Sequence, residues 1–245
     1  MAQSSTCPDD SYQATNMDIT ILTVMPELLE GPLNHSIVQR AQQKGHLSLH
    51  TVSLRDYTTD RYRSVDDYAY GPNAGMVLRI APIDAALEEL TREHPFDEVI
   101  YTSPDGEPLT QQLANELSLK HRIAILCGHY KGIDQRVRDH LVSREVSIGD
   151  YVLSGGELAA AVIIDCIARL LPGVLSDETS ALTDSFQDGL LAPEVYTRPE
   201  EYKGWRVPEI LLSGNHAAIA DWQHARALER TKKLRPDLYA RYLQE

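Results

Sequence analysis

Residues 147–157 read SIGDYVLSGGE, and this stretch decides the fold that we expect. Its Gly155-Gly156 pair opens the apolar segment 157–171, which has the length of a helix. A second glycine-bracketed loop, CGHYKG at 127–132, directly follows the apolar run 123–126, which is typical of a buried strand. Strands that end in glycine turns, one of them beside a helix N-terminus, allow backbone groups to approach a small polar ligand closely. The spacing alone leaves two interpretations open, a ligand site or two tight turns.

Segments with strand and helix character alternate on both sides of these loops. We expect strands at 18–24, 47–54, 98–101, 123–126 and 145–148, and helices at 36–44, 81–93, 110–120, 134–140 and 157–171. This alternation predicts an α/β fold with a mostly parallel sheet that helices cover on both faces. The helix at 157–171 is apolar on nearly every side, which predicts that it is buried between the sheet and a second subunit.

Two stretches interrupt the alternation. Residues 103–106 read SPDG, a composition typical of a β-turn, at the carboxyl end of an expected strand, which is the edge where open α/β sheets bind ligands. Residues 56–76 are polar, rich in tyrosine and arginine, and end in Gly71-Pro72-Asn73-Ala74-Gly75. We interpret this second stretch as a functional loop, because disordered loops are rarely so aromatic.

The two ends of the chain differ from its middle. Residues 1–16 are polar and lack the apolar core of a signal peptide, so we expect a disordered extension. Residues 176–189 are polar, acidic and without a period, which indicates a linker between domains. Helices are expected again at 208–212, 215–234 and 237–244, so residues 190–245 form a small helical domain.

Composition limits the class of protein. The 245 residues are 42% hydrophobic and 24% charged, enough for a full core, and no apolar run approaches the length of a membrane span. Three widely spaced cysteines form no metal or disulfide pattern and suit a reducing cytoplasm. The net charge of −13 argues against nucleic acid as a partner, although residues 196–245 hold nine basic and seven acidic side chains.

Several separated motifs carry a resemblance. Residues 147–157 and the pattern Cys127-Gly128-x-Tyr130-x-Gly132-Ile133-Asp134-x-Arg136 resemble the bacterial tRNA (guanine-N1)-methyltransferases, a family of the knotted SPOUT class of S-adenosylmethionine enzymes. Further matching motifs follow in the family's order: RDY (55–57), VDD (65–67), PGVL (172–175), DSF (184–186), YTRP (196–199) and LSGNH (212–216). The resemblance runs from about Met17 to the C-terminus.

The resemblance implies a fold, a division into domains and partners. Residues 17–175 would be a catalytic domain with a C-terminal trefoil knot, in which loops 127–132 and 147–156 cross; connectivity rules alone would argue against a knot. Residues 190–245 would bind the tRNA anticodon stem-loop. The resemblance thus outweighs the argument that the net charge makes against nucleic acid as a partner. The tyrosines and arginines of 56–76 could stack on RNA and pair with it. A homodimer without membrane attachment is implied.

The resemblance also implies site residues. The methyl donor S-adenosylmethionine would be held by Pro104, Gly106, Gly128, Tyr130, Ile148, Gly149, Asp150, Tyr151, Val152, Leu153, Gly155 and Gly156. The methyl group would go to N1 of the guanine just 3′ of the anticodon. By position in the family motif, Asp184 would be the base that removes the N1 proton, and Arg169 the cation that stabilises charge on O6. Without the resemblance, Asp184 would pass as a solvated linker residue and Arg169 as a helix-dipole cation.

Two other functions remain open from the sequence. One is a knotted methyltransferase that acts on another RNA or on a 2′-hydroxyl. A ribose target does not need a base such as Asp184 to remove the proton from a ring nitrogen, so Asp184 distinguishes the two kinds of target. The other is an adenosine- or RNA-binding module that has lost catalysis, against which the presence of Arg169 and Asp184 argues.

The first glycine loop departs from the family pattern. Most members read GRYEG where this chain reads Gly128-His129-Tyr130-Lys131-Gly132. The acidic residue has been connected with a catalytic Mg²⁺, an ion usually held by carboxylates and water. Lys131 puts a cation there instead, so a bound Mg²⁺ is possible but in doubt, and we assign no metal ligand.

We expect Lys131→Glu to make methyl transfer more dependent on Mg²⁺, because the change removes a cation and restores a carboxylate near the reacting centre. Transfer is measured in chelator and in graded Mg²⁺, with the folding of the RNA checked separately. Wild-type activity that vanishes in chelator and returns with Mg²⁺ would show that Lys131 has not replaced the ion.

Overall fold

The computed structural model describes residues 16–72, 75–175 and 183–244. Most of the expected extension 1–16, the first part of the expected linker 176–189, and Asn73 and Ala74 lie outside the described residues. The chain divides into two compact units between residues 176 and 177. The roles assigned above to 17–175 and 190–245 stay predictions.

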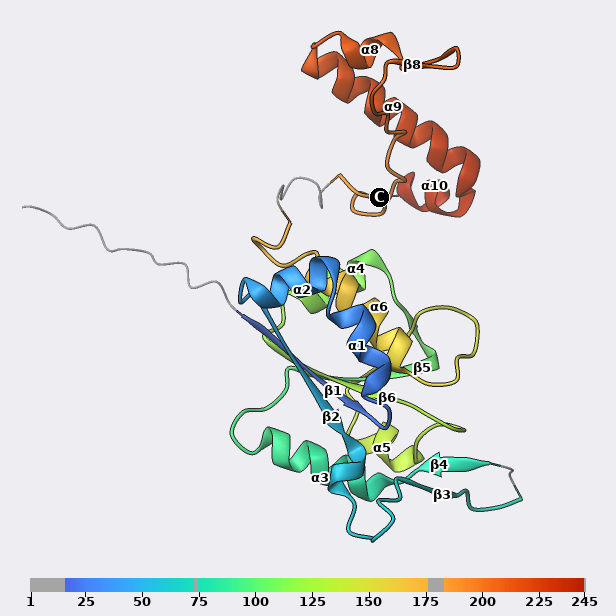
Figure 1. Ribbon diagram of the computed structural model, residues 1–245. Coiled ribbons are helices and arrows are strands. Elements are labelled where there is room, and N and C mark those ends of the chain that lie inside the picture. Colours follow the sequence, from blue (N-terminus) through green and yellow to red (C-terminus); the bar gives the residue numbers. More distant parts are fainter. Residues whose placement is uncertain (1–15, 73–74, 176–182, 245) are drawn as a thin grey trace, which may run out of the picture. The chain divides into compact units, whose positions relative to one another are not determined.

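A five-stranded sheet in the order β2-β1-β6-β5-β7 forms the centre of the first unit (Figure 1). Its strands are β1 (Met17–Thr23), β2 (Leu47–Ser53), β5 (Glu98–Pro108), β6 (Arg122–Cys127) and β7 (Arg144–Ser147). Every neighbouring pair is parallel. The expected mixed α/β fold with a mostly parallel sheet is therefore confirmed. Burial on both faces explains why β6 is a nearly continuous apolar run and why Thr20 and Thr23 of β1 are buried as well.

Helices cover both faces of this sheet (Figure 1). On one face lie α1 (Glu27–Leu33), α2 (Ser36–Gln43), α4 (Gln111–Ser118) and α6 (Glu157–Ala168); on the other lie α3 (Ile80–Thr91) and α5 (Gln135–His140). Each face has its own core cluster of buried side chains. Local capping fixes two helix starts, since the Thr110 hydroxyl accepts from Leu113 N–H and the Asp134 carboxylate from Arg136 N–H.

The expected β-turn at 103–106 is wrong, because these residues belong to β5. Val146 of β7 pairs with Thr102 and then again with Glu107, so the four intervening residues form a bulge in a continuing strand. A Cβ on Gly106 would lie 2.6 Å from the backbone of β7, so glycine is needed there for close packing. Turn composition and bulge composition look alike in a sequence.

The helix expected at 157–171 packs on the sheet with one side, and its other side is exposed in the single chain, so its burial against a second subunit stays a prediction. The helix ends at Ala168, and Leu158 and Val162 are 54% and 42% exposed on its outer side. Ile163, Ile164 and Ile167 on its inner side are fully buried in the core.

Some elements had no signal in the sequence. The irregular stretch 56–76 overlaps a 3-10 helix, η1 (Leu54–Tyr57), and contributes to an antiparallel pair, β3 (Asp66–Tyr68) and β4 (Met76–Leu78). Three-residue strands are too short to show alternation. Helix α1 was not predicted, because Gly31 and Pro32 lie within it and both residue types disfavour a helix interior.

The second unit contains a short pair, β8 (Glu201–Tyr202) and β9 (Trp205–Arg206), and helices α8 (Glu209–Leu212), α9 (His216–Leu234) and α10 (Pro236–Tyr242). The buried Thr231 hydroxyl accepts from Leu191 N–H at 2.8 Å and so fixes the preceding segment on α9. None of the helices in the described ranges combines the length and apolar character needed to span a bilayer.

We expect Leu117→Ala to lower the free energy of unfolding by about 2–5 kcal/mol, because the side chain is fully buried between α4 and the sheet and its loss leaves a cavity. The matched control is Leu119→Ala, two residues later, where the leucine is 80% exposed; its effect should stay within about 0.5 kcal/mol. Urea titration of both variants measures the difference. Equal losses would contradict the burial assigned to α4.

Candidate functional site

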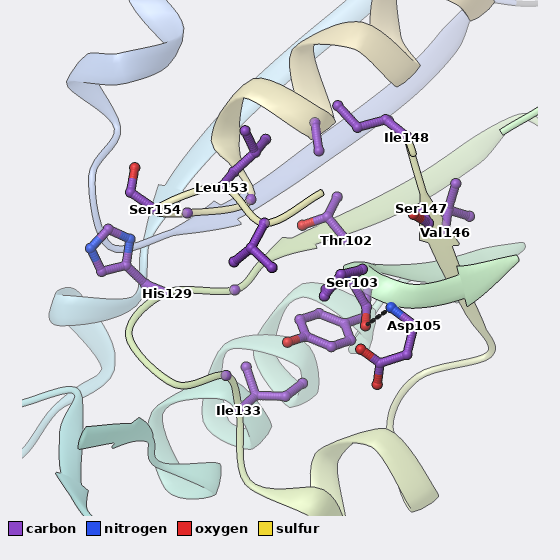
Figure 2. Close-up of a pocket in the computed structure, with 18 of the residues that line it drawn as sticks. Thr102, Ser103, Asp105, His129, Ile133, Val146, Ser147, Ile148, Leu153 and Ser154 are labelled. Carbon is purple, nitrogen blue, oxygen red and sulfur yellow. Dashed lines mark hydrogen bonds between the residues drawn. The ribbon is translucent and has the colours of Figure 1, made fainter. Parts of the chain in front are cut away.

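The carboxyl ends of β6 and β7 and the bulged part of β5 meet next to the N-terminus of α6 (Figure 2). They enclose a cavity of about 300 Å³. The loop after β6 and the loop between β7 and α6 supply most of its wall. Ligands of open parallel sheets bind at this edge, where strand ends leave backbone groups unpaired.

The two glycine loops touch backbone to backbone. Gly156 N–H donates to the Gly128 carbonyl at 2.8 Å, and His129 forms an isolated bridge with Gly155. A Cβ on Gly156 would lie 2.0 Å from the Thr102 hydroxyl and 2.8 Å from Gly128 N. Only glycine therefore fits at the first turn of α6 while the loops stay together.

Local backbone conformation shapes both loops. Tyr130 has φ of +60°, a left-handed conformation that is unusual for a residue with a side chain, and Gly149 has φ of +147°. The Tyr151 ring folds back over Gly149, where a Cβ would approach it to 2.5 Å, and its hydroxyl donates to the Ile148 carbonyl. These contacts hold the second loop in a fixed path around the cavity.

The structure brings most of the expected cofactor residues together. Those that line the cavity are Pro104, Gly128, Tyr130, Ile148, Gly149, Tyr151, Val152, Leu153, Gly155 and Gly156. Gly106 and Asp150 are not among the lining residues. Gly106 instead packs on β7, as described above. Contact of any of these residues with a cofactor stays a prediction.

An ion-pair group at the cavity wall was not predicted from the sequence. Arg138 of α5 donates to Glu145 at 2.6 and 2.7 Å and to Asp105 at 2.7 Å. The hydrogen bond from Arg138 holds the pKa of the Asp105 carboxyl below its ordinary value. Arg138 is thus neutralised by two carboxylates. A lone arginine in a short expected helix gives no sequence signal for such a role.

Tyr101 of β5 also lines the cavity without having been predicted. Burial raises its pKa to about 12, so the phenol is neutral. A Cβ on Gly128 would lie 2.9 Å from its hydroxyl oxygen, which explains why the first loop begins with glycine.

Arg169 is not among the residues that line this cavity. Arg169 is the C-cap of α6, whereas Gly156 at the cavity is the N-cap of the same helix. The helical rise of about 1.5 Å per residue separates the two backbones by about 20 Å. Asp184 belongs to the second compact unit. Their roles in catalysis stay predictions.

The cavity's chemistry suits a small nucleoside-like ligand. Glycine backbone offers N–H and C=O groups, Ile133, Leu153 and Ala159 add apolar surface, and Thr102 and Ser103 add hydroxyls. A side chain at Gly128 or Gly156 would collide with neighbouring groups and fill the space that glycine leaves open in the cavity wall. Among the residues that the structure describes, no group of three or more His, Cys, Asp or Glu side chains is placed to hold a metal ion.

Comparison with known proteins gives consistent matches. The family model described as tRNA (Guanine-1)-methyltransferase TrmD matches residues 17–241. A protein of Porphyromonas gingivalis named tRNA (guanine-N(1)-)-methyltransferase is 62% identical over 222 residues, which are 91% of this chain and 99% of that protein. Proteins of the same name from Christiangramia forsetii and Bacteroides fragilis are 62% and 60% identical, again over 91% of this chain and over 98% and 99% of their own lengths.

We expect Gly156→Ala to weaken binding of S-adenosylmethionine roughly ten- to hundredfold, the equivalent of an overpacking strain of about 1–3 kcal/mol. The added methyl group must displace the Thr102 hydroxyl and the Gly128 backbone. Calorimetry measures the affinity, and circular dichroism checks the fold. Gly31→Ala is the matched control, because a Cβ on Gly31 meets nothing within 4 Å. Unchanged binding by folded Gly156→Ala would remove this contact from the site.

Proposed function

Because the chain belongs to the tRNA (guanine-1)-methyltransferase family, we propose that it transfers a methyl group from S-adenosylmethionine to N1 of the guanine just 3′ of a tRNA anticodon. Family membership makes the chain a tRNA methyltransferase. The identity of the target position and the placement of the donor are the proposal. The observation that carries the donor site is the cavity at the strand ends, with its two glycine loops in backbone contact.

The cavity residues would hold the donor mainly through backbone. Gly128, Ile148, Tyr151 and Leu153 would bind adenine and ribose, with the side chains of Ile133 and Leu153 as apolar walls. When bound, S-adenosylmethionine supplies a methyl group already activated by a sulfonium. The protein therefore has to orient the two reactants and exclude water.

Proton removal and charge stabilisation would come from two further side chains. Guanine N1 carries a proton at neutral pH, so a carboxylate must accept it, and Asp184 has that role in our proposal. Negative charge then develops on O6. The Arg169 guanidinium, which stays charged at every working pH, would stabilise that oxygen.

The geometry of α6 supports a dimer whose sites are shared. With Gly156 and Arg169 about 20 Å apart at opposite ends of one helix, Arg169 cannot reach a methyl group held at its own Gly156. The exposed Leu158 and Val162 leave an apolar stripe on the same helix for a second copy to cover. We propose a two-fold dimer in which Arg169 and Asp184 complete a partner's cavity.

RNA would be held by local features rather than by net charge. Lys232 and Lys233 lie in the last turn of α9, and Tyr68 and Tyr70, in and just after β3, are 80% and 98% exposed. Such tyrosines can stack on unpaired bases of an anticodon loop. We propose that residues 190–245 bind the stem-loop and that 176–189 link this domain to the catalytic one.

Two further features are proposed on the resemblance. Loops 127–132 and 147–156 would be the crossings of a trefoil knot, and the bond between Gly156 and Gly128 supports their contact. Lys131 lines the cavity and places a cation where the family pattern has a carboxylate, so we assign no Mg²⁺ ligand there. A cytoplasmic location would suit the free thiols of Cys127 and Cys166.

Methyl transfer to an anticodon stem-loop tests the function. We expect labelled methyl to reach a stem-loop with guanine at the target position and also one whose target guanosine carries a 2′-O-methyl group. A stem-loop with 1-methylguanine there should accept none. Loss of transfer on the 2′-O-methyl substrate alone would instead indicate a ribose methyltransferase.

We expect Asp184→Asn to bind donor and RNA but to lose transfer about 10²- to 10⁴-fold, because the amide cannot accept the N1 proton. Single-turnover kinetics with saturating donor measures this loss. The matched control is Asp188→Asn in the same segment, whose oxygen can still accept from Leu190 N–H. Comparable losses in both variants would contradict a specific role for Asp184.

Mixing impaired subunits tests the shared site, at a concentration of S-adenosylmethionine too low to fill the weakened cavity of Gly156→Ala. We expect Asp184→Asn mixed with Gly156→Ala to regain part of the activity, because a hybrid dimer holds one cavity and one carboxylate that are both intact. The mixture is assayed after dissociation and reassociation. Activity that stays at the level of the separate variants, or an active monomer in sedimentation, would contradict the shared site.

A further inference from the structure

Two buried polar atoms beside the cavity lack hydrogen-bond partners. They are Glu157 Oε2 and His129 Nδ1, both fully shielded from solvent within the part of the chain that the structure describes. Both border the same small space, because a Cβ on Gly155 would lie 2.3 Å from Oε2 and 2.7 Å from Nδ1. The two atoms are therefore no more than about 5 Å apart, the sum of those distances.

The other carboxylate oxygen is already fixed. Thr23 donates its hydroxyl to Glu157 Oε1 at 2.7 Å and accepts from Met25 N–H at 2.9 Å. Glu157 is only 1% exposed, so its second oxygen has no access to bulk water. A buried carboxylate oxygen without a donor is costly, and such atoms are almost always satisfied in folded proteins.

The surroundings leave His129 as the donor. Cys127 is a further titratable neighbour of Glu157; it is fully buried, and the pKa of its thiol is raised by burial and raised further by the charge of Glu157. The Tyr130 ring lies nearly perpendicular to the imidazole, with the ring centroids 4.8 Å apart. Figure 2 shows His129 on one loop, facing the loop that carries Leu153 and Ser154.

We propose that His129 is a positioning residue whose Nδ1–H donates to Glu157 Oε2, directly or through one buried water. A space bordered by two polar atoms that are no more than about 5 Å apart suits either form. The bond would join the loop after β6 to the first turn of α6, beside the bond from Gly156 to Gly128. It would also fix the imidazole tautomer, as a carboxylate partner does for histidines in other sites.

The consequence for the donor rests on the proposed function. Gly128, Gly155 and Gly156 line the cavity, so anything that holds their loops together keeps its walls in place. His129 would thus act on methyl transfer through the donor-binding loops, without accepting a proton from the substrate.

The tautomer is tested first, in the protein without donor, by nitrogen NMR of labelled histidine at about pH 8, above the ordinary histidine pKa of about 6.5. We expect His129 to carry its proton on Nδ1. In Glu157→Gln the side-chain amide can donate to Nδ1, so the proton should move to Nε2. His140, which is exposed on α5, serves as the control resonance and should not change. An Nε2–H tautomer in the wild type overturns the proposal, and so does an Nδ1–H tautomer that Glu157→Gln leaves unaltered.

The effect on the cavity is tested by calorimetry with S-adenosylmethionine. We expect His129→Leu to bind about tenfold more weakly, the loss expected for a hydrogen bond to a charged group. His129→Asn, which keeps an N–H near the place of Nδ1, should retain most of the affinity, and His140→Leu all of it. Equal affinities of the Leu and Asn variants overturn the positioning role. If the wild type binds no S-adenosylmethionine but His129 shows the expected Nδ1–H tautomer, the proposed function is contradicted. The proposed bond between His129 and Glu157 is then still supported.

Discussion

The close contact between the Gly128 carbonyl and the Gly156 N–H is the constraint on which the site depends. It joins the end of β6 to the start of α6, two points that are 28 residues apart in the chain. The contact is possible only because neither residue has a side chain, since Tyr101 and Thr102 fill the places that Cβ atoms would need. The parallel sheet brings the strand ends to one edge, and this contact turns the edge into a walled cavity.

Helix α6 connects that cavity to the rest of the proposed chemistry. Its buried side packs in the larger core cluster, so the helix and the glycine at its start are held rigidly by the sheet. Its length places Arg169 about 20 Å from the cavity, which separates the donor from the proposed charge-stabilising residue within one chain. The exposed Leu158 and Val162 lie between these two ends. One helix thereby contributes to core packing, to a cavity wall and to the proposed contact with a second copy.

Charged side chains in this acidic protein are arranged in local ion pairs and small groups. Arg138 at the cavity is paired with Asp105 and Glu145, so it adds little net positive charge to the ligand site. Glu157, buried at the first turn of α6, has one oxygen held by Thr23 and the other beside His129. Cations available to RNA lie elsewhere, among them Lys232 and Lys233 at the end of α9. A chain with net charge −13 can therefore act on RNA through restricted patches.

The sequence by itself determined the alternation of strands and helices, the two glycine loops and, through the motifs of residues 127–136 and 147–157, the family. These features are local, because periodicity, capping residues and glycine pairs reflect the conformation of neighbouring residues. Tertiary structure alone decided that 103–106 is a bulge, since that depends on where β7 pairs. It likewise decided that α6 has an exposed stripe, that Arg138 joins Asp105 and Glu145, and that His129 and Glu157 face one space. Each of these depends on residues that are distant in the chain, and a single sequence carries no record of which distant side chains meet.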